Sequence, residues 1–129
     1  MLSSSRALRR SAVISRNIGR SMSNFITVGD DDAFTKLEHS ESKQVMYFTA
    51  TWCPPCKLIG PVVEKMAPEY PGVQFLKVDV DQNPEAALKY AIRSVPTFLF
   101  AEDGDLTGPG VVGADEGGIR DELNKLTGN

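Results

Sequence analysis

Two cysteines, Cys53 and Cys56, lie in the segment Trp52-Cys53-Pro54-Pro55-Cys56-Lys57. The apolar run Val45 to Thr49 before them is typical of a buried strand, and a helix-like pattern follows. A strand that leads into a helix places Cys53 at the helix N-terminus, where unpaired amides and the helix dipole favour its thiolate. Cys56, one turn further on, is placed to attack a mixed disulfide at Cys53. This spacing predicts reversible dithiol/disulfide chemistry, with Cys53 as the nucleophile and Cys56 as the resolving thiol.

The length of 129 residues provides for one domain. Charge is unevenly divided along it. The first 22 residues carry five arginines and no acid, so the remainder holds 9 basic and 17 acidic residues, a formal charge of −8. An acidic body argues against nonspecific nucleic-acid binding, which needs Lys and Arg to neutralise phosphates. No segment approaches the ~20 apolar residues of a membrane span. We therefore expect neither a nucleic-acid partner nor a membrane.

Residues 1–22 have the composition of an organelle transit peptide, because arginine, serine and interspersed apolar residues occur without acids. A secretory signal needs a longer apolar stretch than Ala12-Val13-Ile14. The arginine density favours the mitochondrial matrix over the plastid, and we expect cleavage near residues 20–23. A disordered basic tail is the alternative. The predicted organisation is thus a transit peptide over 1–22 and one folded domain over 23–129.

Strand and helix patterns alternate after residue 22. The helix from Pro55 to about Tyr70 contains Pro61, which predicts a kink. Leu106 to Val112 is expected to form a hairpin with the strand 97–100 across the turn 102–105. This order predicts an α/β fold, a mixed central sheet with helices on both faces. The other expected strands are 25–28, 45–49 and 73–80, and the other helices begin at about 30, 83 and 115.

Three separated segments carry a family resemblance: Ala50 to Lys57, Lys77 to Pro84, and Ile92 to Thr97. With these residues, in this order and spacing, the chain resembles the thioredoxin family from Phe25 to Leu126. The resemblance implies the thioredoxin fold. The segment Met46 to Ala50, taken with the leader, is most similar to the mitochondrial o-type thioredoxins of photosynthetic organisms.

The resemblance also implies a docking surface for substrates. Pro96 matches the family's cis-proline, which packs beside the cysteines and exposes the preceding backbone for substrate pairing; the alternative is a trans-proline that opens a strand. Trp52 is similar to the tryptophan of the reactive surface, or else it is a half-buried core aromatic. Gly113 matches a glycine that permits close approach of a partner. With Val95, these residues are expected to form an apolar patch.

One departure from the family pattern lies between the cysteines, where Pro54 replaces the usual glycine. Pro54 and Pro55 have no N–H, which leaves the Cys56 amide as the local donor to the Cys53 sulfur. Fewer donors raise the pKa of Cys53, whereas a stiffer loop favours the disulfide, and the balance of the two effects stays open. These prolines and Lys57 are expected to tune the redox potential.

A second departure is Tyr47, which stands where the family has a buried aspartate beneath the cysteines. Lys77 matches the lysine beside that aspartate, and we expect it to be partly buried without an acid partner, which would depress its pKa. We hypothesise that water, Lys77 or the bound substrate helps to deprotonate Cys56. The alternative for Tyr47 is a core aromatic whose hydroxyl is satisfied.

These observations predict a general protein-disulfide reductase that binds no cofactor. The resemblance implies electrons from NADPH through thioredoxin reductase, and peroxiredoxins and metabolic enzymes as clients. The chain has no glycine-rich phosphate loop of its own.

Other functions remain open at this stage. A net oxidase or isomerase would use the same residues at a higher reduction potential. A metal or iron–sulfur protein requires a dimer, because one chain offers two cysteines and His39 against four ligands. We assign no metal ligand and give His39 no role. A purely structural disulfide is disfavoured in a reducing matrix.

Overall fold

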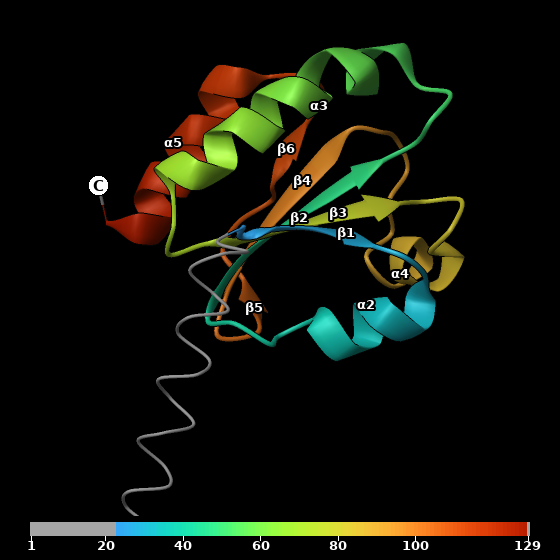
Figure 1. The fold of residues 1–129 in the computed structure, drawn as a ribbon, viewed down its shortest axis with the longest axis horizontal. Coiled ribbons are helices and arrows are strands. Elements are labelled where there is room, and N and C mark those ends of the chain that lie inside the picture. Colours follow the sequence, from blue (N-terminus) through green and yellow to red (C-terminus); the bar gives the residue numbers. More distant parts are fainter. Residues whose placement is uncertain (1–22, 129) are drawn as a thin grey trace, which may run out of the picture.

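The structure, a computed structural model, describes residues 23–128, and its centre is a six-stranded sheet in the order β1-β3-β2-β4-β5 with β6 beside β4 (Figure 1). Strand β3 pairs in parallel with β1 and β2, whereas β4 runs antiparallel to β2, β5 and β6. The predicted mixed sheet is confirmed. The strands are β1 Phe25–Val28, β2 Lys43–Thr49, β3 Gln74–Asp79, β4 Thr97–Glu102, β5 Asp105–Leu106 and β6 Val111–Val112.

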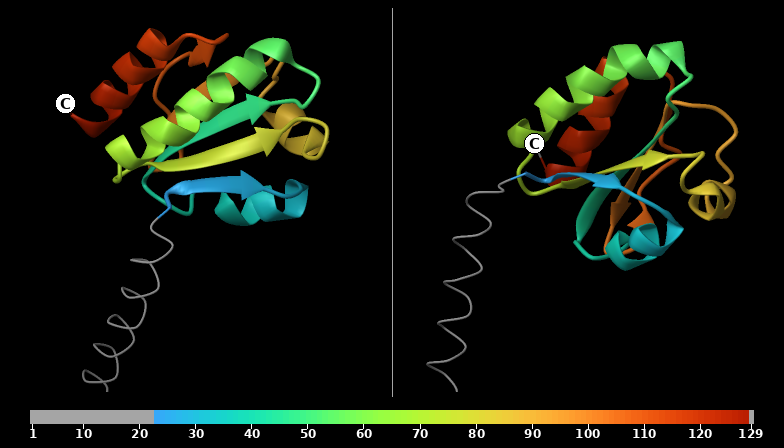
Figure 2. Two further views of the ribbon diagram at one scale, coloured as in Figure 1. Left: turned by 45° about the horizontal axis from the view of Figure 1, so that its top comes forward. Right: turned by 45° about the vertical axis from the view of Figure 1, so that its right-hand side comes forward.

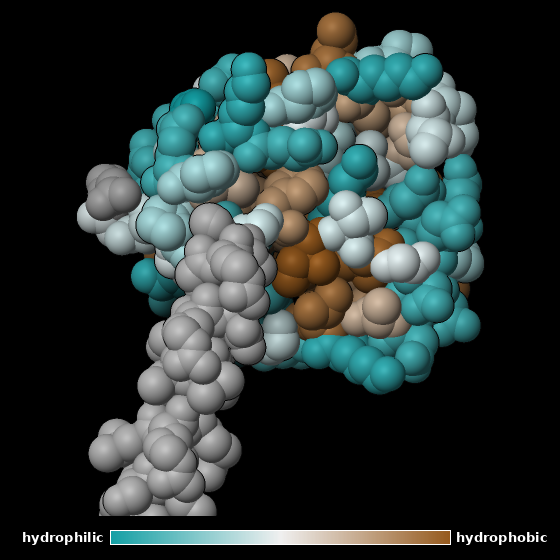
Figure 3. Space-filling model, viewed as in Figure 1, coloured by the Kyte–Doolittle hydropathy of each residue, from teal (hydrophilic) through white to brown (hydrophobic). Residues whose placement is uncertain are grey.

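Helices cover both faces of this sheet, as predicted (Figure 2). Helices α3 (Pro54–Met66) and α5 (Glu116–Thr127) pack on one face, and α2 (Asp31–Leu37) and α4 (Pro84–Lys89) pack on the other. On the face shown in Figure 3 a hydrophobic patch lies near the middle, further hydrophobic residues stand at the upper edge, and hydrophilic residues cover most of the rest. None of the helices between residues 23 and 128 is long and apolar enough to span a bilayer.

Strand β2 lies at the centre of the sheet, and its sequence contains a continuous apolar run. Val45 and Tyr47 belong to the core under α3 and α5, and Met46 and Phe48 belong to the core under α2 and α4. Successive side chains of a strand point to opposite faces. Because both faces are covered, nearly every position of β2 is buried, and the four residues from Val45 to Phe48 are apolar.

Helix α3 carries the cysteine motif and is continuous across Pro61. Gly60 precedes this proline and has no Cβ to clash with the proline ring, which suits a helical residue before proline. The helix ends at Met66, and a 3₁₀ turn, Ala67–Glu69, completes the segment that the sequence predicts as one helix to about Tyr70.

The predicted hairpin partner over 106–112 is wrong as a single strand. Two short strands, β5 and β6, pair with β4 separately. Pro109 between them has no amide to donate to a ladder. Gly110 has a φ of +85°, and a Cβ there would come closer than 3.0 Å to the Phe98 carbonyl oxygen. The predicted transit peptide over residues 1–22 lies outside the described residues.

Candidate redox site

Cys53 and Cys56 are joined by a disulfide at the start of α3, with their Cα atoms 5.2 Å apart. Cys53 is the N-cap of the helix, with extended backbone angles, and its Sγ accepts a hydrogen bond from the Cys56 amide at 3.2 Å. Pro54 and Pro55 occupy the first helical positions, where a missing N–H costs no intrahelical bond. The Cys56 amide is thus the local donor to the Cys53 sulfur, as the sequence predicts.

The start of α3 is electrostatically suited to a thiolate. Its first turn contains no acidic residue, and Lys57 follows Cys56 with an exposed side chain. The helix dipole places partial positive charge at this end and favours an anion there. In the reduced protein, negative charge on Cys53 is therefore stabilised. Both cysteines are only 3% exposed, so a client must dock closely to reach the sulfur atoms.

Val95 lies against Cys53, and Pro96 and Gly113 follow from it. The Val95–Pro96 peptide bond is cis, as the resemblance implies, and the Cys53 Sγ lies 3.5 Å from the Val95 carbonyl oxygen. Gly113 donates its amide to the Pro96 carbonyl at 2.8 Å and has open space where a Cβ would stand. The structure thus joins Val95, Pro96 and Gly113 of the predicted docking patch into one connected group that begins at the nucleophile.

Trp52 lies at the surface, 63% exposed, and is not a core aromatic. Its indole Nε1 donates to the Asp81 Oδ2 at 2.8 Å. No motif in the sequence singles out Asp81, although β2 and β3 are parallel neighbours whose ends meet at one edge. Nor does a motif single out Val112, which is 65% exposed next to Gly113. Pro96 itself is buried, whereas Trp52 and Val112 present exposed apolar side chains beside Cys53 and Gly113 in the chain.

Tyr47 is a buried aromatic residue with a satisfied hydroxyl. Its ring stacks on Phe98 with centroids 4.8 Å apart and planes within 4°. Its hydroxyl donates to the Cys56 carbonyl at 3.3 Å. Burial raises the pKa of Tyr47 above its ordinary value, and the charge of Glu64 acts in the same direction. The phenol is therefore a hydrogen-bond donor at physiological pH and not a proton acceptor.

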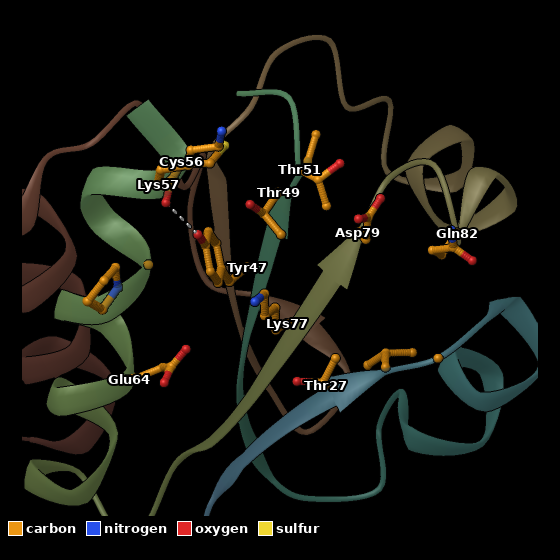
Figure 4. A pocket seen from close by; sticks show the side chains of 15 residues that line it. Thr27, Tyr47, Thr49, Thr51, Cys56, Lys57, Glu64, Lys77, Asp79 and Gln82 are labelled. Carbon is orange, nitrogen blue, oxygen red and sulfur yellow. Dashed lines mark hydrogen bonds between the residues drawn. The ribbon is translucent and has the colours of Figure 1, made fainter. Parts of the chain in front are cut away.

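A cleft of about 620 Å³ opens beside Cys56, between α3 and the ends of β1, β2 and β3 (Figure 4). Lys77 lies between Thr27 and Tyr47 in the register of the sheet and is partly buried, as predicted. Glu64 lines the same cleft from α3. Glu64 could not be found from the sequence, because its place at the cleft depends on how helix α3 is oriented on the sheet.

Metal binding has no support in the described part of the chain. Between residues 23 and 128, no three side chains of His, Cys, Asp or Glu are grouped to hold one ion. The arrangement that these residues do present is a disulfide capping a helix beside a cis-proline. With a mixed sheet covered on both faces, this site defines a thiol–disulfide oxidoreductase.

Comparison with known proteins identifies the family to which this chain belongs. The family model described as Thioredoxin matches residues 25–125. A thioredoxin of Geodia cydonium is 42% identical over 104 residues, which cover 81% of this chain and 98% of that protein. The chain therefore belongs to the thioredoxin family, and it is a protein-disulfide reductase.

Two solved structures from yeast share the fold. Mitochondrial thioredoxin 3 from Saccharomyces cerevisiae, in its oxidised form, has a TM-score of 0.72 and 33% identity, and the match covers 79% of this chain and 95% of that one. A structure that addresses thiol resolution in yeast mitochondrial 1-Cys peroxiredoxin through glutathione and thioredoxin systems matches with a TM-score of 0.72 and 32% identity, over 79% and 95% of the chains.

Proposed function

We propose that this protein is a mitochondrial thioredoxin of the o-type that carries electrons from NADPH, through thioredoxin reductase, to disulfides of client proteins. Peroxiredoxins and metabolic enzymes are the expected clients. The observation that supports this activity most strongly is the position of Cys53, which caps α3 directly beside Val95 and the cis-proline.

The cycle assigns one role to each cysteine. The Cys53 thiolate attacks a sulfur atom of the client disulfide, forms a mixed disulfide and releases one client thiolate. Cys56 then loses its proton and attacks the Cys53 sulfur, which releases the second client thiolate and leaves the Cys53–Cys56 disulfide. Two electrons from NADPH, delivered by thioredoxin reductase, restore the dithiol.

Clients dock on the exposed apolar surface around Cys53. Trp52 and Val112 offer this surface, Val95 lies against the reactive sulfur, and Gly113 leaves room for a partner's backbone. Because both sulfur atoms are buried, this contact precedes the thiol exchange. Water in the cleft, Lys77 or the bound substrate assists the deprotonation of Cys56. The prolines between the cysteines, with Lys57, tune the potential.

The mitochondrial assignment is supported by the composition of residues 1–22 and by the likeness to a mitochondrial thioredoxin of yeast. Import of the full chain into isolated mitochondria and plastids tests it. We expect protection from protease in mitochondria and a new N-terminus near residues 20–23. Protection in plastids alone would assign the protein to that organelle instead.

The reductase cycle is tested by the consumption of NADPH in the presence of thioredoxin reductase, a peroxiredoxin and peroxide. We expect turnover with the full chain and none with Cys53→Ser. Absence of turnover with folded, reduced protein would contradict the proposed electron donor. A measured reduction potential in the range of oxidases and isomerases, ~100 mV or more above that of reducing thioredoxins, would contradict the direction of electron flow.

A further inference from the structure

Cys56 is held by hydrogen bonds at both of its backbone polar groups. Its amide donates to the Cys53 Sγ at 3.2 Å, and its carbonyl accepts from the Tyr47 hydroxyl at 3.3 Å, the dashed line in Figure 4. In an α-helix the same carbonyl also accepts the amide four residues on, here that of Gly60. A carbonyl oxygen has two lone pairs, so the tyrosine is an additional donor to the first turn of α3.

The Tyr47 hydroxyl is itself held rigidly. Tyr47 is 1% exposed in the central strand β2, and its ring stacks on Phe98. Gly60 faces the hydroxyl from α3, where an added Cβ would lie 3.5 Å from the phenolic oxygen. The sheet therefore fixes the peptide group of the resolving cysteine through one side chain.

Tyr47 holds this peptide group without exchanging protons. Burial raises the pKa of the phenol and outweighs a hydrogen bond with the Thr49 side chain, which lowers it, so the hydroxyl stays protonated over the pH range of thiol exchange. The charged groups that line the cleft beside it are Lys57 and Glu64 from α3, and Lys77 and Asp79 from β3. The cleft also reaches Cys56.

We propose that Tyr47 is a positioning residue for the resolving step: its hydroxyl holds the Cys56 peptide group in the geometry from which the Cys56 sulfur attacks Cys53. This role rests on the thiol cycle proposed above. The chemistry of the step is unchanged, because the proton of Cys56 goes to solvent and the electron pair of the broken disulfide leaves with the client sulfur. Tyr47 neither gives nor takes a proton.

The two steps of the cycle can be separated with 5,5′-dithiobis(2-nitrobenzoate). The Cys53 thiolate attacks the reagent and releases one thionitrobenzoate, at a rate that depends on reagent concentration. Cys56 then attacks Cys53 and releases the second, at a rate that does not. Stopped-flow absorbance of the fully reduced full chain gives both rate constants, and Cys56→Ser, which releases only one equivalent, identifies the second phase.

Tyr47→Phe removes the hydroxyl and keeps the ring on Phe98. We expect the second phase to slow by up to about five-fold, equivalent to about 1 kcal/mol at 1.36 kcal/mol per tenfold change. The slowing should be equal at every pH, and the first phase should be unchanged. Hydrogen exchange of the Cys56 and Lys57 amides should quicken in the same variant, which a loss of overall stability alone would not confine to this turn.

Tyr70→Phe is the matched control. Tyr70 is another core tyrosine, and its hydroxyl donates to Asn124 at 3.0 Å, away from the cysteines in the sequence. This variant should lose stability without a change in either phase. A second phase that is unchanged in Tyr47→Phe, or slowed as much by Tyr70→Phe, would overturn the proposal. A shifted pH midpoint in Tyr47→Phe would also overturn it, because Tyr47 would then handle the proton.

Absence of the first phase in the unsubstituted chain is a separate result. It would show that Cys53 is not the nucleophile and would overturn the cycle together with the role of Tyr47. Urea unfolding of both phenylalanine variants measures how much of any change is a loss of fold.

Discussion

Gly110 holds the strand that carries one side of the docking surface, and its replacement by alanine tests how that strand is seated. The residue has a φ of +85°, a region that side chains with a Cβ rarely adopt. An added Cβ would come closer than 3.0 Å to the Phe98 carbonyl oxygen and to a methyl carbon of Leu99. Because β6 pairs with Phe98 through Val111, relief of this clash must move β6 away from β4.

Two terms set the size of the effect. A left-handed backbone costs a residue with a Cβ about 1–2 kcal/mol. Overpacking against atoms that cannot move freely costs about 1–3 kcal/mol more. We therefore expect Gly110→Ala to lower the free energy of unfolding by about 2–5 kcal/mol. At about 4 °C per kcal/mol for a domain of this size, the Tm falls by roughly 8–20 °C.

Two other glycines in the same region provide graded controls. Gly113 has a φ of +99° but open space around an added Cβ, so alanine there should cost only the backbone term of about 1–2 kcal/mol. Gly108 has no positive φ and only a contact at 3.9 Å, so its alanine variant should lie within about 0.5 kcal/mol of the unsubstituted protein. Urea unfolding followed by circular dichroism ranks the three. Gly110→Ala no less stable than Gly113→Ala would refute the reasoning.

Three further predictions concern the contacts around the sheet. Burial alone would raise the pKa of Glu38, but hydrogen bonds from Lys89 and Tyr90 lower it below its ordinary value of 4.5. Its stabilisation, about 1 kcal/mol, is thus present above pH 4.5 and lost as pH falls below that value, and Glu38→Gln should flatten this acid limb in urea titrations. The two amide hydrogens of Asn24 are shared among three carbonyls that follow α3, so Asn24→Ala should cost about 2 kcal/mol in the same assay, and an unchanged midpoint would contradict this. Asp81→Ala frees the indole of Trp52 and should raise the KM for a protein client several-fold at unchanged kcat, whereas a fall in kcat alone would place Asp81 in the chemistry instead.

The elements that follow local periodicity could be predicted from the sequence. The apolar run of β2 requires two covered faces, and the alternation of strand and helix patterns defines the layers. The position of Cys53 at a helix start follows from a strand, a turn and two prolines that suit the first helical positions. In each case the cause lies in residues adjacent in sequence.

Features that depend on tertiary contact could not be predicted in the same way. Residues 106–112 follow a turn and end in two valines, which favours one hairpin strand, but the close approach of Gly110 to Phe98 helps to divide the segment into two short strands. Asp81 meets Trp52 only because two parallel strands end at one edge. The Tyr47 hydroxyl donates a hydrogen bond to a backbone carbonyl of α3. Every residue type has such a carbonyl, so the sequence cannot identify this partner.

The central claim is that Cys53 attacks and Cys56 resolves, and trapping of a mixed disulfide tests it most directly. The reduced Cys56→Ser and Cys53→Ser chains are each mixed with a disulfide-containing client, and the covalent adducts are measured by mass spectrometry. We predict one client per chain, linked through Cys53, in the first variant, and no comparable adduct in the second. A stable adduct through Cys56 in Cys53→Ser, with none in Cys56→Ser, would contradict the account.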